Sequence, residues 1–134
     1  MTDLATSVGS VALRAPVLTA SGTAGHGAEL AHYVRPAELG AVVVKSMKPG
    51  PWPGNPAPRV HPTPGGMINS VGLQGEGIEH WLEHDLPALA ATGAEIVASI
   101  WGGTVDEFAA AAELLSTAPD VVAAVEVNVS CPNL

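Results

Sequence analysis

The chain has 134 residues, of which 47% are hydrophobic and 13% charged, and this composition predicts a folded domain rather than a disordered segment. Its formal net charge is −8 with only five basic residues, which argues against binding to nucleic acid or to an anionic membrane surface. One cysteine excludes an internal disulfide and is typical of a reducing compartment. Because no apolar run approaches membrane-spanning length, we expect a cytoplasmic protein with no membrane anchor.

The N-terminal third is predicted to contain a β-hairpin, two strands and a short helix. Gly9-Ser10 lies between valines, and a glycine-first pair of this kind is typical of a two-residue hairpin turn. Apolar runs at residues 16–20 and 40–44 have the length and composition of buried strands, and residues 28–34 between them are expected to form a short helix.

A proline-rich excursion follows the second predicted strand. Seven prolines fall between Pro49 and Pro64, which excludes a helix there. A long ordered loop inside a compact domain is usually functional, so we expect this segment to serve the site. Residues 59–60 and 67–68 are predicted to pair as a small hairpin within it.

The second half is predicted to alternate helix and strand. Residues 75–92 have helical spacing that places five apolar residues on one face: Ile78, Trp81, Leu82, Leu86 and Leu89. A break is expected near Asp85 because of Pro87, and a C-cap at Gly93. Strands are expected over residues 95–100 and 121–127, and the apolar, β-branched run at 121–127 is expected to be buried. Thr104 and Glu107 form a capping box for a helix whose predicted inward residues are Val105, Phe108, Ala112 and Leu115.

Alternating strands and helices favour a parallel α/β architecture. Polar residues follow each predicted strand: Ser21, then Lys45 with Ser46, then Ser99, then Asn128. An α/β barrel places its ligand at the carboxyl ends of its strands, so this pattern favours a barrel. A doubly wound sheet is the alternative, although residues 21–25 match the expected glycine pattern poorly.

Several residues have a structural and a functional interpretation. Cys131 lies in the motif that follows the last predicted strand, and a lone cysteine is more often a small buried hydrophobe than a reactive group. Lys45 closes an apolar strand, either with a solvated ammonium group or with one aimed at a ligand. Glu126 shares a strand face with Asn128 and needs a partner, so we interpret it as a structural group of the barrel interior. The pair His80 and His84 belongs to a solvated helix face, and we predict no metal site.

Four segments, in order along the chain, resemble the FMN-dependent dihydroorotate dehydrogenases: Ala20-Ser21-Gly22, Val44-Lys45-Ser46, Asn69-Ser70-Val71-Gly72-Leu73-Gln74 and Asn128-Val129-Ser130-Cys131-Pro132-Asn133. The last segment is the most specific, and the match covers only the first half of the family's polypeptide. The resemblance implies the N-terminal half of a (β/α)8 TIM barrel preceded by a β-hairpin. Residues 1–134 are then expected to be a partial FMN-dependent dehydrogenase domain, truncated after the fourth strand and with an open sheet edge that favours association.

The same resemblance implies oxidation of dihydroorotate to orotate at a CH–CH bond, a step of pyrimidine biosynthesis. Cys131 would be the base that removes the C5 proton of the substrate while the C6 hydride passes to flavin N5. The residues implied to contact FMN are Ser21, Lys45, Ser46, Ser99 and Asn128. The residues implied to hold dihydroorotate or orotate are Lys45, Asn69, Ser70, Val71, Gly72, Leu73, Asn128 and Asn133.

The resemblance also sets expectations for partners. A cysteine base, rather than serine, points to the soluble class of the family, with NAD reached through an iron–sulfur flavoprotein subunit or with fumarate as the electron acceptor. We expect a homo-oligomer in the full-length form, and little activity or FMN retention from this chain alone. Two other functions stay open: pyrimidine reduction of the dihydropyrimidine dehydrogenase type, and a non-catalytic half-barrel that binds a partner.

Overall fold

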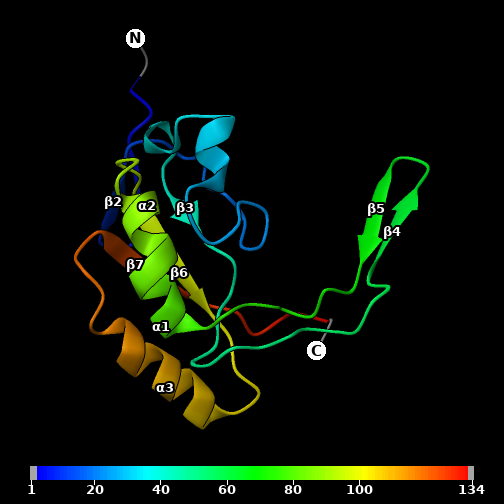
Figure 1. Ribbon diagram of the computed structural model, residues 1–134. Helices are drawn as coiled ribbons and strands as arrows, with labels where there is room; N and C mark the ends of the chain where they lie inside the picture. The colour runs from blue at the N-terminus through cyan, green and yellow to red at the C-terminus, as the bar shows by residue number, and fades with distance from the viewer. Residues whose placement is uncertain (1–2, 133–134) are drawn as a thin grey trace.

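The computed structural model describes residues 3–132, which form a parallel sheet with helices packed against it and two separate hairpins (Figure 1). The strands are β1 (Thr6–Val8), β2 (Val11–Leu13), β3 (Val42–Val43), β4 (Val60–Thr63), β5 (Gly66–Asn69), β6 (Ile96–Ile100) and β7 (Val122–Val127). The helical elements are the 3₁₀ turns η1 (Glu29–His32) and η2 (Pro36–Glu38), then α1 (Ile78–His80), the π-turn η3 (Trp81–Asp85), α2 (Leu86–Ala90) and α3 (Val105–Leu115).

The central sheet has the strand order β3-β6-β7, and both pairings are parallel. Residues 16–20, predicted to be a buried strand, contribute only a single parallel bridge from Leu18 to Ala41. Val17 beside it is 60% exposed, because this segment has a hydrogen-bonded neighbour on one side only within the described chain. The predicted helix over residues 28–34 is likewise shorter than expected and is the 3₁₀ turn η1.

The core lies between this sheet and the α1–η3–α2 segment. Val42, Val44 and Ile96 of the sheet region are fully buried against Ile78 and Leu89 of the helices. Burial of side chains of this size stabilises the fold by roughly 1.5–3 kcal/mol each. The inward face predicted from the helical spacing of residues 75–92 is therefore confirmed.

The predicted break near Asp85 is present only as a π-turn, because the backbone stays helical at Asp85 and Leu86 and does not separate two helices. The chain passes through the π-turn η3 and continues as α2 from Leu86, which places Pro87 in the first turn of α2. Proline is tolerated there because its missing N–H would have no partner within the helix. Gly93 ends the segment with φ of +74°, a left-handed conformation that favours glycine, as expected for its predicted C-cap role.

The N-terminus of α3 forms as predicted, but its inward face differs. The Thr104 side chain accepts a hydrogen bond from the N–H of Glu107. Phe108 packs against the core, whereas Val105 is 84% exposed and the buried alanine is Ala111. At about 100° of rotation per residue, the face set by Phe108 and Ala111 turns Val105 away from the sheet.

Two outer features shape the region around the strand ends. The β4–β5 hairpin, predicted from residues 59–60 and 67–68, forms with Val60 opposite Asn69 and projects away from the body (Figure 1). Strand β7 was expected to be buried, but Val125 and Val127 are 45% and 55% exposed because β7 is the last strand of the sheet in the described chain.

Candidate functional site

Polar side chains from the ends of β3, β6 and β7, and from the segment after the Leu18 bridge, meet in one hydrogen-bonded network. Ser46, which follows β3, is fully buried, and its Oγ lies 3.0 Å from Ser21 Oγ and 2.8 Å from Ser99 Oγ. Asn128, which follows β7, donates its side-chain N–H to Ser46 Oγ at 2.9 Å. Ser99, near the end of β6, is also fully buried and donates to Glu126 Oε1 at 2.8 Å. Four of the five residues predicted to contact the cofactor are thus joined through Ser46.

Because each serine hydroxyl has only one proton to donate, the donor and the acceptor of each hydrogen bond in this network can be assigned. Because Ser99 gives its proton to Glu126, it accepts from Ser46. Ser46 then has no second proton to give and accepts from both Ser21 and the Asn128 amide. The donors therefore run from Ser21 through Ser46 and Ser99 to the carboxylate of Glu126. Ser21 is left with its acceptor lone pairs free for another donor.

A cavity of about 400 Å³ opens beside the exposed end of this network. Its lining residues come from the end of β7 and the loop after it, and from the segment that follows the Leu18 bridge: Ala20, Ser21, Glu126, Val127, Asn128 and Ser130. The Asn128 amide is held at both ends, because its oxygen accepts from the N–H of Ser130 at 3.2 Å. A hydroxyl acceptor and a fixed amide beside the Glu126 carboxylate suit a planar ligand that carries both N–H and C=O groups.

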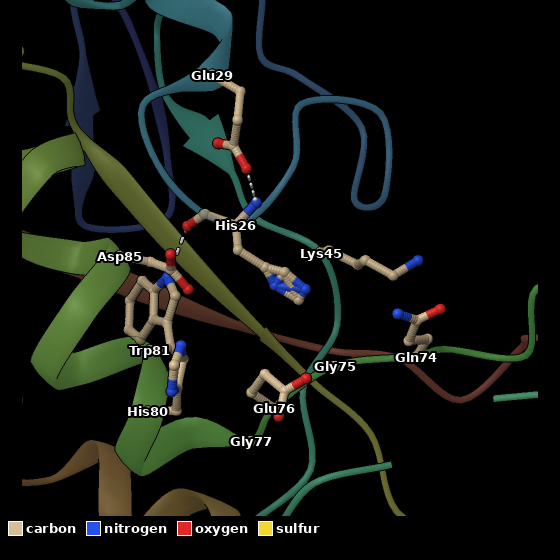
Figure 2. A pocket seen from close by; sticks show the side chains of 10 residues that line it. All are labelled: His26, Glu29, Lys45, Gln74, Gly75, Glu76, Gly77, His80, Trp81 and Asp85. Atoms are coloured by element: carbon tan, nitrogen blue, oxygen red, sulfur yellow. Dashed lines mark hydrogen bonds between the residues drawn. The ribbon is translucent and has the colours of Figure 1, made fainter. Parts of the chain in front are cut away.

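Lys45 lies next to Ser46 but borders a different cavity, of about 360 Å³. Its backbone N–H donates to Gly25 O at 2.9 Å, and Figure 2 shows its side chain pointing toward Gln74. The remaining lining residues include three carboxylates and two histidines, and the full set is His26, Glu29, Lys45, Gln74, Gly75, Glu76, Gly77, His80, Trp81 and Asp85. Lys45 therefore places a positive charge in a largely acidic cavity. The pattern of polar residues after the predicted strands did not indicate that these carboxylates and histidines would lie beside it.

The floor of this second cavity is set by His26 and Trp81. Trp81 is almost fully buried and donates its indole N–H to His26 O at 2.7 Å (Figure 2). Burial lowers the pKa of His26 from its ordinary value of 6.5, although Asp85 and Glu29 nearby act in the opposite direction. Burial by itself would raise the pKa of Glu29, but backbone N–H groups, including that of Gly27 at 2.8 Å, outweigh it and hold this pKa below its ordinary value.

His26 predicts a pH dependence of stability. Below about pH 6.5 the unfolded chain protonates this histidine while the folded chain resists doing so, so the unfolded state binds more protons and stability falls as the pH falls. Urea unfolding of wild type and His26→Gln between pH 5 and 8 should show a steeper loss toward low pH in the wild type. The other four histidines are common to both proteins and cancel in the comparison. Parallel pH profiles would contradict the assignment.

The segment predicted to hold substrate follows the β4–β5 hairpin. Asn69 ends β5, and its Oδ1 accepts from the N–H of Val71 at 3.4 Å. Leu73 has φ of +54°, an uncommon conformation for a branched side chain, and such strain concentrates at functional sites. Asn69 and Ser70 line a cavity together with residues of β4, whereas Ser21 and Asn128 line the cavity beside the Ser46 network, so the two predicted groups border different cavities.

Cys131 lies in the loop after β7, three residues beyond Asn128. It is half-buried and its thiol is free. No hydrogen bond joins that thiol to another predicted site residue within residues 3–132. Asn133, also predicted to hold substrate, lies outside the described residues. Glu126 was interpreted from sequence as needing a polar partner, and Ser99 is that partner, although Glu126 itself is exposed rather than interior.

Comparison with known proteins decides the family. The family model described as dihydroorotate dehydrogenase matches residues 3–134. The chain belongs to the dihydroorotate dehydrogenase family. Enzymes of this family are flavoproteins, which agrees with a ligand site at the carboxyl ends of parallel strands.

Two relatives illustrate the match to the dihydroorotate dehydrogenase family. The chain is 42% identical over 132 residues to a protein of Geotalea uraniireducens (strain Rf4) and 46% identical over 132 residues to one of Thermoanaerobacter sp. (strain X514). Both are named dihydroorotate dehydrogenase B (NAD(+)), catalytic subunit, and each alignment covers 98% of this chain. The chain spans 43% of the length of either relative.

A solved structure shows the same fold. The dihydroorotate dehydrogenase of Eimeria tenella, in complex with ferulenol, superposes with a TM-score of 0.66 at 21% sequence identity. The superposition covers 98% of this chain and 37% of that one.

Within residues 3–132, no helix combines the length and the apolar character needed to cross a bilayer.

Proposed function

We propose that residues 1–134 are a partial domain, the N-terminal half of a (β/α)8 barrel preceded by the β1–β2 hairpin, within an oxidoreductase that converts dihydroorotate to orotate in pyrimidine biosynthesis. The observation that carries this proposal is the network in which Ser46 joins Ser21, Ser99 and Asn128 at the carboxyl ends of parallel strands. Barrel enzymes build their active sites at these strand ends. Membership of the dihydroorotate dehydrogenase family supports the chemistry.

The donor set fits FMN. Ser21 offers an acceptor and Asn128 an amide beside the cavity of about 400 Å³, and both are uncharged groups that suit the polar edge of a flavin ring. Ser46 and Ser99 are fully buried, so we assign them to orienting Ser21 and Asn128. Lys45, adjacent in sequence to Ser46, would supply the positive charge near the ring. When bound, FMN would supply the hydride acceptor for the CH–CH bond of the substrate.

The chain's other predicted residues would bind and deprotonate the substrate. Asn69 and the backbone N–H groups up to Leu73, together with Asn128 and Asn133, provide the donors and acceptors that a planar ureide requires. Cys131 would take the C5 proton, and a thiol in this role needs a neighbouring cation or N–H groups that stabilise the thiolate. Lys45 is the basic residue that directly follows a predicted parallel strand, so the sequence pattern places it on the same edge of the sheet as Cys131.

The relatives suggest the partner. Both are named as catalytic subunits of an NAD(+)-dependent enzyme, which implies a second subunit in those proteins. We propose that the protein containing this chain passes electrons from its flavin to NAD through an iron–sulfur flavoprotein subunit, and that it is a homo-oligomer in the cytoplasm. Fumarate would be the acceptor if no such subunit associates.

A chimaera tests the proposal most directly. Residues 1–134 are joined to the remaining segment of the Thermoanaerobacter relative, which is 46% identical over the shared part. The purified chimaera is expected to carry FMN, identified by absorbance and by release of the cofactor, and to bleach when dihydroorotate is added without oxygen. Bleaching by dihydrouracil but not dihydroorotate would favour the dihydropyrimidine dehydrogenase type. A chimaera that binds flavin and responds to neither substrate would contradict the proposed activity.

A further inference from the structure

Four residues outside the Ser46 network form a cluster around one partly buried ammonium group, that of Lys48. Lys48 Nζ lies 2.7 Å from Glu107 Oε1, 4.9 Å from the centre of the Trp52 ring and 5.1 Å from that of Trp101. The two indole rings meet edge to face at 5.6 Å. A cation between two aromatic faces and a carboxylate is a strong and directional contact when it is shielded from water.

The cluster lies beside the same strand ends as the candidate site. Lys48 and Trp101 follow β3 and β6, and the N–H of Trp101 donates to Met47 O at 2.9 Å. Trp101 is 4% exposed, and its indole N–H has no hydrogen-bond partner within the described chain. Its polar contact in the cluster is therefore made by the face of the ring, with the Lys48 ammonium group. Glu107 in the first turn of α3 also accepts from the N–H of Gly103 at 2.6 Å, which fixes its carboxylate.

Trp52 connects this cluster to the loop predicted to hold substrate. Its indole N–H donates to Gly72 O at 3.0 Å, and its backbone exchanges two hydrogen bonds with Gly75, at 2.8 and 3.0 Å. Further along, the N–H of Asn55 donates to Val71 O at 3.0 Å. The approach is so close that a Cβ on Gly54 would lie 2.3 Å from Val71 O. Residues 69–75 are therefore held against residues 52–59, and residue 52 is held by the cluster.

We propose that Lys48, Trp52, Trp101 and Glu107 are positioning residues that hold residues 69–75 in a set place relative to the carboxyl ends of β3 and β6. The importance of that loop for substrate rests on the proposed function, but the mechanical role does not. The Lys48–Glu107 ion pair joins residues 59 apart in sequence, and it links the proline-rich excursion to helix α3. Without the ammonium group, the base of the excursion is expected to open locally while the sheet stays intact.

Amide hydrogen exchange on the full chain tests this role. Lys48→Met keeps the side-chain stem and removes the charge, and it should speed exchange at the amides of Trp52, Asn55 and Gly75 roughly threefold to tenfold. The amide of Asn128, which donates to Ile100 O between β6 and β7, should not change. Lys48→Arg keeps the charge and the ring contact and should restore protection.

Glu107→Gln removes the negative charge that pairs with Lys48 and leaves Lys48 itself unchanged. The glutamine side chain can still accept the hydrogen bond from the N–H of Gly103. Glu38→Gln is the matched control, because Glu38 forms an ion pair with Arg35 whose side chains are 60% and 82% exposed. Unchanged exchange in both Lys48→Met and Glu107→Gln, or equal acceleration at Asn128, would overturn the positioning role. In the chimaera, Lys48→Met should raise KM for dihydroorotate with flavin content unchanged. If the chimaera lacks that activity, the proposed function fails while the exchange result still decides the positioning role.

Discussion

Replacing Cys131 by alanine in the flavin-loaded chimaera is expected to slow flavin reduction by dihydroorotate at least about a hundredfold, because a placed base contributes about 10²- to 10⁴-fold. Cys131 is the one free thiol of the described chain, half-buried three residues beyond the anchored amide of Asn128. Orotate and FMN binding should stay near the unsubstituted values, since a thiol lost from a loop removes little contact area. Anaerobic stopped-flow measurement of flavin bleaching provides the rate.

Two companion variants sharpen this test. Cys131→Ser should retain part of the rate only at higher pH, because a hydroxyl is a weaker acid than a thiol and is harder to deprotonate. Thr117→Ala is the control, as the exposed Thr117 hydroxyl donates only to Leu114 O at the end of α3, away from the candidate site. A packing role for Cys131 would instead lower the stability of the alanine variant and leave the reduction rate per flavin unchanged.

Ser46→Ala is expected to lower the free energy of unfolding of the chain by about 2–4 kcal/mol. Ser46 accepts hydrogen bonds from Ser21 and Asn128 and donates to Ser99, and it is fully buried. Its removal leaves the half-buried Ser21 hydroxyl and Asn128 amide without the acceptor that they share. Each such loss is typically worth about 1–3 kcal/mol. Urea unfolding of wild type and variant at pH 7 measures the difference.

The control for this variant is Ser116→Ala. Ser116 also donates a hydrogen bond, to Glu113 O at 2.6 Å, but it is exposed at the end of α3, where water replaces the lost partner. Its substitution should change stability by no more than about 0.5 kcal/mol. If Ser46→Ala has an equally small effect, the serine network does not act as a buried, directed unit. Loss of FMN from the chimaera carrying Ser46→Ala would further support its role in orienting Ser21.

Local chemistry in the sequence was enough to predict several elements. The turn at Gly9-Ser10 and the cap at Thr104 each depend on a few adjacent residues, and both form as expected. The irregularity before Leu86, a π-turn in place of the predicted break, follows from the covalent geometry of Pro87. The motif around Cys131 likewise indicated the family before any contact was known, because a run of consecutive residues carries that signal.

Side-chain orientation was less predictable than element type. The helical spacing of α3 made Val105 an inward residue, but Val105 is exposed and Ala111 is buried. A short helix has several apolar stripes, and contact with the sheet selects one of them. Val17 was expected to be buried because it lies in an apolar run of strand length, but such a run does not indicate whether a neighbouring element covers it, and Val17 is exposed.

The sequence by itself determined that polar groups end each parallel strand, because a strand's boundary and the residue after it are local features. Only the tertiary structure decided that Ser21, Ser46 and Ser99 donate in one direction toward Glu126, since these partners are 25, 53 and 27 residues apart in sequence. The same holds for Lys48 and Glu107, which sequence analysis did not single out as a pair. Parallel pairing of β3, β6 and β7 brings these strand ends together, and the order of strands in a sheet is a property of the packed chain.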